Sequence, residues 1–78
     1  MTNIDKYKQA FIESFNVDES QLFTLNYQDI SEWDSVGHMG LIALLEEYFQ
    51  IMMDAEDIVD FSSYKKGLKI LIKYDVEF

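Results

Sequence analysis

An acid, a hydroxyl and an imidazole lie close together near the middle of this chain. Asp34, Ser35 and His38 fall within five residues, directly before a long apolar run. A serine hydrolase uses these residue types, with the imidazole aligned on the hydroxyl and the carboxylate behind the imidazole. Asp34 and Ser35, however, are sequence neighbours that point in different directions, and no Gly-x-Ser-x-Gly turn surrounds the serine. The sequence therefore predicts no catalytic residues and no enzyme activity of the chain's own.

Metal binding has little support in the same residue types. His38 is the only histidine, and we expect it to be a solvent-facing helical residue. The acidic stretch 54–60, with the sequence DAEDIVD, lacks the glycine and the terminal glutamate of a calcium loop. A short helix with an acidic first turn, which the helix dipole favours, explains these acids. We therefore predict no metal site.

Ser35 has two interpretations. A serine directly before a helical apolar run is commonly an N-cap, but Asp34 can fill the same role. If Asp34 is the cap, the Ser35 hydroxyl is free for something else. A helix N-terminus presents unpaired N–H groups and positive potential, which favour a phosphate diester. The residues alone thus indicate either a plain cap or a hydroxyl well placed to carry a phosphate.

Apolar residues recur at helical spacing in four segments. The first segment follows Thr2 or Asn3 as N-cap and has the apolar side Ile4, Tyr7, Phe11, Ile12 and Phe15. The second should run from Ser35 to about Gln50 with a stripe of Val36, Met39, Ile42, Ala43 and Phe49. A short helix follows Asp54 as its cap. The last helix follows Ser62 or Ser63 and should bury Tyr64, Leu68, Leu71 and Ile72.

A long connection, residues 16–34, separates the first two predicted helices. It has no sustained apolar period, and its apolar and aromatic residues indicate that it packs onto the helices. The 78 residues suit one domain, 1–78, with a single small core. The predicted fold is all-α, a four-helix bundle of three main helices and one short helix with a long first connection.

Charge limits the partners that this chain can have. The net charge is −9, and no Lys or Arg occurs between Gln9 and Tyr64. Nucleic acid and anionic membranes are therefore disfavoured, since both need clustered cations. An acidic surface is suited to basic patches on proteins. With no cysteine, no signal-like leader and no apolar run near 18 residues, we expect a cytoplasmic protein.

The segment WDSVGHMGLIALLEEYF resembles the phosphopantetheine-attachment motif of acyl carrier proteins, Asp-Ser-Leu followed by a helix ending Leu-Glu-Glu-x-Phe. The matching residues here are Asp34, Ser35, Val36, Leu45, Glu46, Glu47 and Phe49. Downstream, DAEDIVDFSSYKKGLKIL resembles the family's acidic short helix, its hydrophobic-Ser/Thr-Ser/Thr step and its final amphipathic helix. The resemblance covers essentially the whole chain and implies an acyl-carrier-protein-like bundle.

The resemblance implies that a phosphopantetheinyl transferase esterifies Ser35 with 4′-phosphopantetheine from coenzyme A. The thiol of that cofactor would carry an acyl group as a thioester. Asp34 would present charge beside Ser35, and Val36 would pack at the core edge within the transferase footprint. Acyl-loading and acyl-transfer enzymes would place basic patches against acids of the second and third helices, namely Glu46, Glu47, Glu56 and Asp57. By the same resemblance, we expect a monomer.

This chain departs from bacterial fatty-acid carriers at two positions. Those carriers usually have acids two and five residues after the serine, where this chain has Gly37 and Gly40. Glycine in a helix interior costs roughly 0.8–1 kcal/mol relative to alanine, so we expect a flat, less charged patch that selects other partners. Tyr48 likewise replaces a frequent third acid, and Trp33 before Asp34 resembles discrete carriers of specialised pathways.

We therefore favour a stand-alone carrier for polyketide-like, surface-saccharide or similar acyl transfer. Two alternatives remain. In the first, the chain is an aminoacyl or peptidyl carrier. In the second, it belongs to a different class: it is an acidic helical adaptor without a cofactor, and Ser35 is only a cap.

Overall fold

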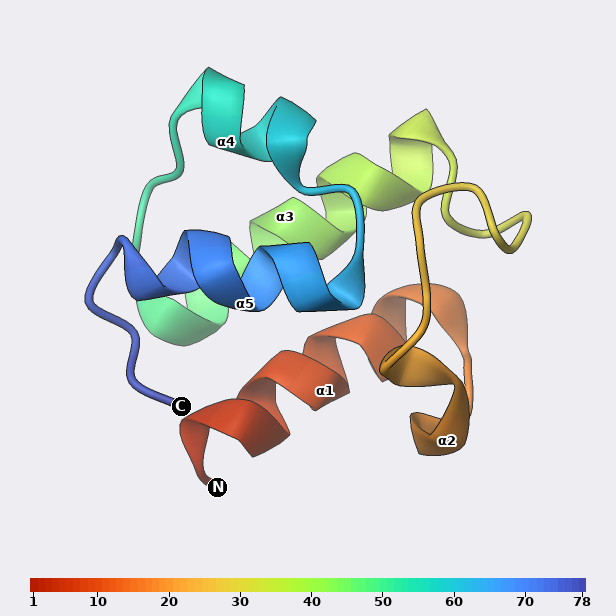
Figure 1. Cartoon of the computed structure of the whole chain (residues 1–78), viewed down its shortest axis with the longest axis horizontal. Helices are drawn as coiled ribbons and strands as arrows, with labels where there is room; N and C mark the ends of the chain where they lie inside the picture. Colours follow the sequence, from red (N-terminus) through yellow and green to blue (C-terminus); the bar gives the residue numbers. More distant parts are fainter.

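Five α-helices and no strands make up the protein in a computed structural model that describes residues 1–78 (Figure 1). The helices are α1 Asn3–Phe15, α2 Glu19–Leu22, α3 Ser35–Phe49, α4 Ala55–Asp60 and α5 Tyr64–Ile72. The three longest, α1, α3 and α5, and the short α4 confirm the all-α prediction. The one-turn helix α2 was not predicted and lies within the long connection. None of the five helices combines the length and the apolar composition that a membrane crossing requires.

Aromatic side chains from distant parts of the sequence form the centre of the core. The largest fully buried ones are Tyr7, Phe11, Phe15, Trp33 and Phe61. Tyr7 donates a hydrogen bond from its hydroxyl to the Tyr64 carbonyl at 2.7 Å, which ties α1 to the start of α5. The buried Tyr7 hydroxyl therefore has the hydrogen-bond partner that a buried polar group requires.

The long connection packs into the core, as predicted from its apolar residues, and it is also hydrogen-bonded to the link between α4 and α5. Leu22, Leu25 and Trp33 are buried. The Tyr27 N–H donates to the Ser62 carbonyl at 2.8 Å, and the Tyr64 N–H donates to the Leu25 carbonyl at 3.0 Å. These bonds place the connection beside the pocket described below.

The buried face of α3 differs from the predicted stripe. Leu41, Ile42 and Leu45 are buried, whereas Val36 and Met39 are 79% and 53% exposed and Ala43 is also exposed. The prediction is confirmed for Ile42, and Phe49 is half-buried against the core, but it was wrong for Val36, Met39 and Ala43. Because α3 is apolar around most of its circumference, spacing alone does not fix which side faces the core. In α5, Tyr64 and Leu71 are buried as predicted, but Ile72 is 58% exposed.

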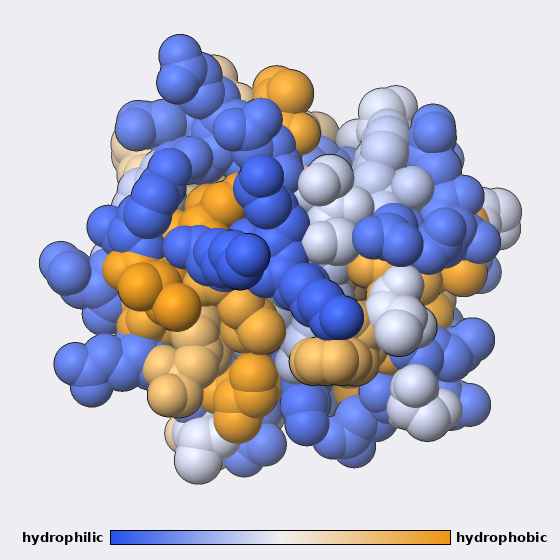
Figure 2. All heavy atoms as spheres, viewed as in Figure 1, coloured by the Kyte–Doolittle hydropathy of each residue, from blue (hydrophilic) through white to orange (hydrophobic).

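The two ends of the chain lie near each other, on the side of Figure 1 away from the start of α3. The Asn3 side-chain amide donates to the Glu77 carbonyl at 2.9 Å. Apolar atoms also reach the surface in several places between hydrophilic side chains on the face drawn in Figure 2.

Candidate functional site

The start of α3 settles which residue caps the helix. The Asp34 carboxylate accepts a hydrogen bond from the Gly37 N–H at 2.8 Å, so Asp34 is the N-cap. Ser35 becomes the first helical residue, it is exposed, and its hydroxyl forms no hydrogen bond within the chain. Because Asp34 caps the helix, the Ser35 hydroxyl has no structural role in the fold.

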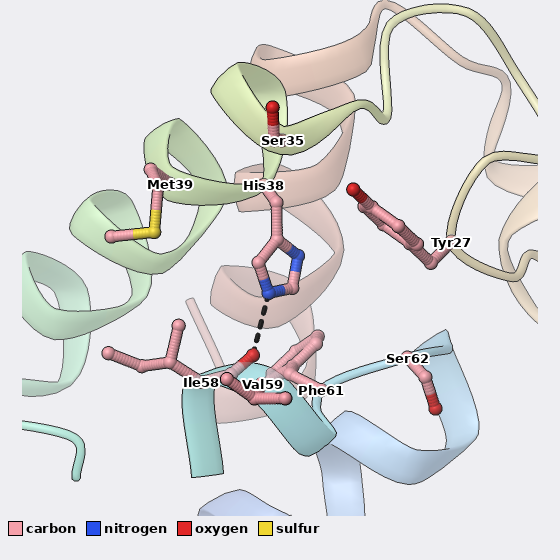
Figure 3. Close-up of a pocket in the computed structure, with 8 residues that line it drawn as sticks. All are labelled: Tyr27, Ser35, His38, Met39, Ile58, Val59, Phe61 and Ser62. Carbon is pink, nitrogen blue, oxygen red and sulfur yellow. Dashed lines mark hydrogen bonds between the residues drawn. The ribbon is translucent and has the colours of Figure 1, made fainter. Parts of the chain in front are cut away.

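A largely apolar pocket of about 350 Å³ lies beside Ser35 (Figure 3). Ser35 and Met39 line it from α3, and Ile58 and Val59 line it from α4. Tyr27 closes it from the long connection. The pocket thus lies between α3 and α4, next to an exposed hydroxyl.

His38 is not the solvent-facing residue that the sequence predicted. It is half-buried, and its Nδ1 accepts a hydrogen bond from the Trp33 indole Nε1–H at 2.9 Å. Because an indole N–H can only donate, Nδ1 carries no proton, and the proton on Nε2 is donated to the Ile58 carbonyl at 2.7 Å. The prediction failed because both partners are brought to His38 by tertiary packing.

The three residues of the candidate triad are not hydrogen-bonded to one another. Asp34 bonds to the Gly37 N–H, and His38 bonds to Trp33 and Ile58. Figure 3 shows the Ser35 hydroxyl directed away from the imidazole. This arrangement contains no nucleophile–base pair of the kind that a hydrolase needs.

The two glycines of α3 have different surroundings. A Cβ added at Gly37 would overlap the Glu32 carbonyl oxygen and lie 3.2 Å from the Phe15 ring, so this glycine permits the connection to pack against α3. A Cβ added at Gly40 would meet nothing within 4 Å. The expectation that both glycines shape a partner surface therefore needs correction, since Gly37 has a packing role and only Gly40 is free of one.

The predicted partner-facing residues fall into two groups. Val36, Glu47 and Glu56 are exposed. The placing of Val36 at the core edge was wrong, because its side chain points outward from the first turn of α3. Glu46 is half-buried and accepts a hydrogen bond from the Met53 N–H at 2.9 Å, so part of its role is to hold the chain after α3.

Asp57 is the least suited of these acids to meet a partner. It is 7% exposed, and its carboxylate accepts hydrogen bonds from the Lys73 ammonium and the Tyr74 hydroxyl. Both hydrogen bonds lower the pKa of the Asp57 carboxyl, and the one from Lys73 has the larger effect. Its charge is therefore used within the fold, between α4 and the chain that follows α5.

Two exposed pocket residues were not predicted: Met39 was expected in the buried stripe of the second helix, and Val59 was given no role. Met39 is half exposed and Val59 is 79% exposed, and both line the pocket. Exposed apolar side chains that gather in one patch commonly mark contact with another molecule. For Met39 the only signal was the apolar character of α3 on most sides, which favours a core position, and the six-residue α4 that contains Val59 is too short to show an apolar period.

No group of three or more His, Asp or Glu side chains is arranged to hold a metal ion. Comparison of the chain with protein-family models, with curated proteins and with solved structures found no match.

Proposed function

We propose that this protein is a carrier of acyl groups in which Ser35 is the attachment point for 4′-phosphopantetheine. The observation that carries the proposal is the unused, exposed hydroxyl of Ser35 at the start of α3, freed because Asp34 is the cap. The motif around it, WDSVGHMG followed by LEEYF, supports the same assignment through its resemblance to the attachment motif of acyl carrier proteins.

The residues around Ser35 suit such a group. The first N–H groups of α3 and their positive potential favour a phosphate diester at this position. Val36 and Met39, one and four residues after Ser35 in α3, are exposed and offer apolar contact to an enzyme or to a pantetheine arm. The apolar pocket between α3 and α4 begins at Ser35 itself.

The attachment reaction needs a separate transferase. The Ser35 oxygen would bond to the phosphorus of the pantetheine phosphate in coenzyme A as the bond to the other phosphate breaks, releasing adenosine 3′,5′-bisphosphate. The transferase would take the hydroxyl proton, because neither Asp34 nor His38 is hydrogen-bonded to Ser35. When bound, the group supplies the terminal thiol that this cysteine-free chain lacks, and that thiol holds an acyl group as a thioester.

Partner enzymes would meet the exposed face of α3 and α4. Glu47 and Glu56 offer charge to basic patches, while Gly40 and Met39 leave the surface near Ser35 uncharged. We propose partners from a specialised acyl-transfer pathway, since the chain lacks the acids that bacterial fatty-acid carriers usually have near the serine. Glu46 and Asp57 contribute less, because each is engaged within the fold.

Intact-mass measurement after incubation with coenzyme A and a broad-specificity phosphopantetheinyl transferase tests the proposal. The native chain should gain one phosphopantetheine, and Ser35→Ala should gain none. Ser62→Ala is the matched control, because Ser62 is an exposed serine lining the same pocket, and it should be modified like the native chain.

A native chain that gains no mass beside a well-modified reference carrier would favour the adaptor alternative, with Ser35 only opening the helix. Modification of Ser35→Ala would also overturn the assignment, since it would place the attachment elsewhere.

A further inference from the structure

Helix α5 carries three exposed lysines on its outer side. Lys65, Lys66 and Lys69 form no ion pair and no side-chain hydrogen bond within the chain. They are three and four residues apart in sequence, so they are neighbours on one side of the helix. α5 passes in front of α3 in Figure 1, and in the same view hydrophilic side chains cross the position of α5 in Figure 2. These three residues form the lysine face of α5.

The stability of the fold does not explain the lysine face. Lys65 and Lys66 are in the first turn of α5, which contains no acid, and the helix dipole disfavours cations there. Lys69 follows Lys65 by four residues and Lys66 by three, and like charges at these spacings destabilise a helix. Solubility does not explain the lysines either, because each of them reduces the size of the net charge of −9. Contact with another molecule would explain why this side of α5 is basic.

Exposed apolar side chains border the lysine face. The Lys65 ammonium lies 4.4 Å from the centroid of the Phe23 ring, and that ring is largely exposed. Ile72, three residues after Lys69, is 58% exposed on the same side of α5. This surface therefore offers cations and apolar contact together, which suits an amphipathic protein segment better than a small free anion.

We propose that the lysine face is a docking surface for an acidic amphipathic helix of another protein. Four residues of a helix rise about 6 Å, so glutamates four residues apart on a partner helix match the spacing of Lys65 and Lys69. Three free ammonium groups are fewer than the roughly four to eight that mark binding to anionic lipid headgroups. The proposal concerns a surface apart from Ser35 and stands whether or not Ser35 carries a cofactor.

The acidic remainder of the chain does not prevent this contact. The chain measures 29 × 27 × 19 Å, so acids on its far side lie beyond the Debye length of about 8 Å at physiological salt. A partner on the lysine face is therefore attracted by the nearby ammonium groups and is repelled little by the distant carboxylates.

Nuclear magnetic resonance with a synthetic helical peptide, at about 0.15 M salt, tests the proposal. The probe has glutamates four residues apart on one side with leucines beside them, and its control has glutamine at each glutamate position. When the glutamate peptide is added to the full native chain, the amide signals of Lys65, Lys69 and Ile72 should shift. Those of Leu41 and Ile42 in α3 should not. The glutamine peptide should bind roughly two- to thirtyfold more weakly, the value of two exposed ion pairs.

Two double variants separate the lysine face from the total charge of the chain. Lys65→Gln with Lys69→Gln should weaken binding of the glutamate peptide by the same factor and should leave Tm unchanged, because neither side chain has a partner in the fold. Lys6→Gln with Lys8→Gln is the matched control, because it removes the same charge from α1. This control should bind the peptide as the native chain does.

Several outcomes would overturn the proposal. The absence of α5 shifts with the glutamate peptide would do so, as would equal weakening in the two double variants. Shifts of α5 signals on concentrating the chain alone would assign the surface to a second copy. Shifts that appear only with phosphatidylserine vesicles would assign it to a membrane, and either result would exclude the protein helix as its occupant.

Discussion

The first two turns of α3 present two faces that differ in what they touch. The inward face, formed by Gly37, His38 and Leu41, contacts the connection, α4 and the core. The outward face, formed by Val36, Met39 and Gly40, is exposed to solvent, and a Cβ added at Gly40 would meet nothing within 4 Å. Ser35 begins the outward face with a free hydroxyl.

This difference separates what the fold requires from what it leaves available. Each inward residue has a neighbour in the chain that explains its type, whether a carbonyl, an indole or a packed ring. The outward residues are apolar or lack a side chain. On an exposed helix surface, neither kind of residue adds to the stability of the fold. We expect substitutions on the inward face to change folding and substitutions on the outward face to change binding.

The largest effect on stability should come from Gly37→Ala. The new Cβ would overlap the Glu32 carbonyl oxygen and press on the Phe15 ring, so the connection must shift away from α3. Overpacking of this kind costs about 1–3 kcal/mol of unfolding free energy. Denaturant unfolding followed by circular dichroism measures it, and a Gly37→Ala chain as stable as the native one would contradict the packing role of this glycine.

Gly40→Ala, three residues along the same helix, should have the opposite sign. Its Cβ meets nothing within 4 Å, so alanine brings only its higher helix propensity, about 0.8–1 kcal/mol. For a domain of this size that gain raises Tm by roughly 4–8 °C. If the outward face binds partners, the stabilised chain should still lose affinity for an enzyme that packs on the bare backbone. A decrease in Tm would show that Gly40 has an internal role.

The smallest effect extends the comparison to α4, where Asp57 faces inward and Glu56 faces outward. Because Lys73 and Tyr74 lower the pKa of Asp57, the folded chain binds fewer protons at this site than the unfolded chain. The contribution of the pair is therefore full above the ordinary pKa of an aspartate, about 3.9, and is lost as the pH falls below it. Asp57→Asn should remove that part of the pH dependence of Tm.

Glu56→Gln is the matched control for this measurement, because Glu56 is exposed and its side chain forms no hydrogen bond or ion pair. Its Tm should follow that of the native chain at each pH. The effect of Asp57→Asn should remain modest, since Lys73 is largely exposed and water screens the pair. Equal pH profiles for the two variants would mean that the Asp57 pair does not stabilise the fold.

The sequence predicted the helical class, the start of α3 at Ser35 and the competition between Asp34 and Ser35 for the cap. Those features depend on local spacing and on cap chemistry, which neighbouring residues determine. The buried side of α3 was not predictable in the same way, because Val36 and Met39 are as apolar as the residues that enter the core.

The role of His38 was beyond local reasoning for a different reason. Its partners are an indole five residues earlier and a backbone carbonyl twenty residues later, and only the folded chain brings them to one ring. The packing role of Gly37 was not predictable from local spacing either, because the carbonyl that excludes a side chain there belongs to the irregular connection. The one-turn helix α2 was missed because four residues are too few to show an apolar period.

The meeting of the two chain ends through Asn3 and Glu77 has a practical consequence for handling the protein. Both ends lie away from the start of α3 in Figure 1, so a tag or surface tether joined to either end leaves Ser35 facing open solution. A short peptide joining the ends would also close the chain into a ring without displacing α1 or α5. Such a ring would present the same helix start to modifying enzymes, with no terminus left to fray.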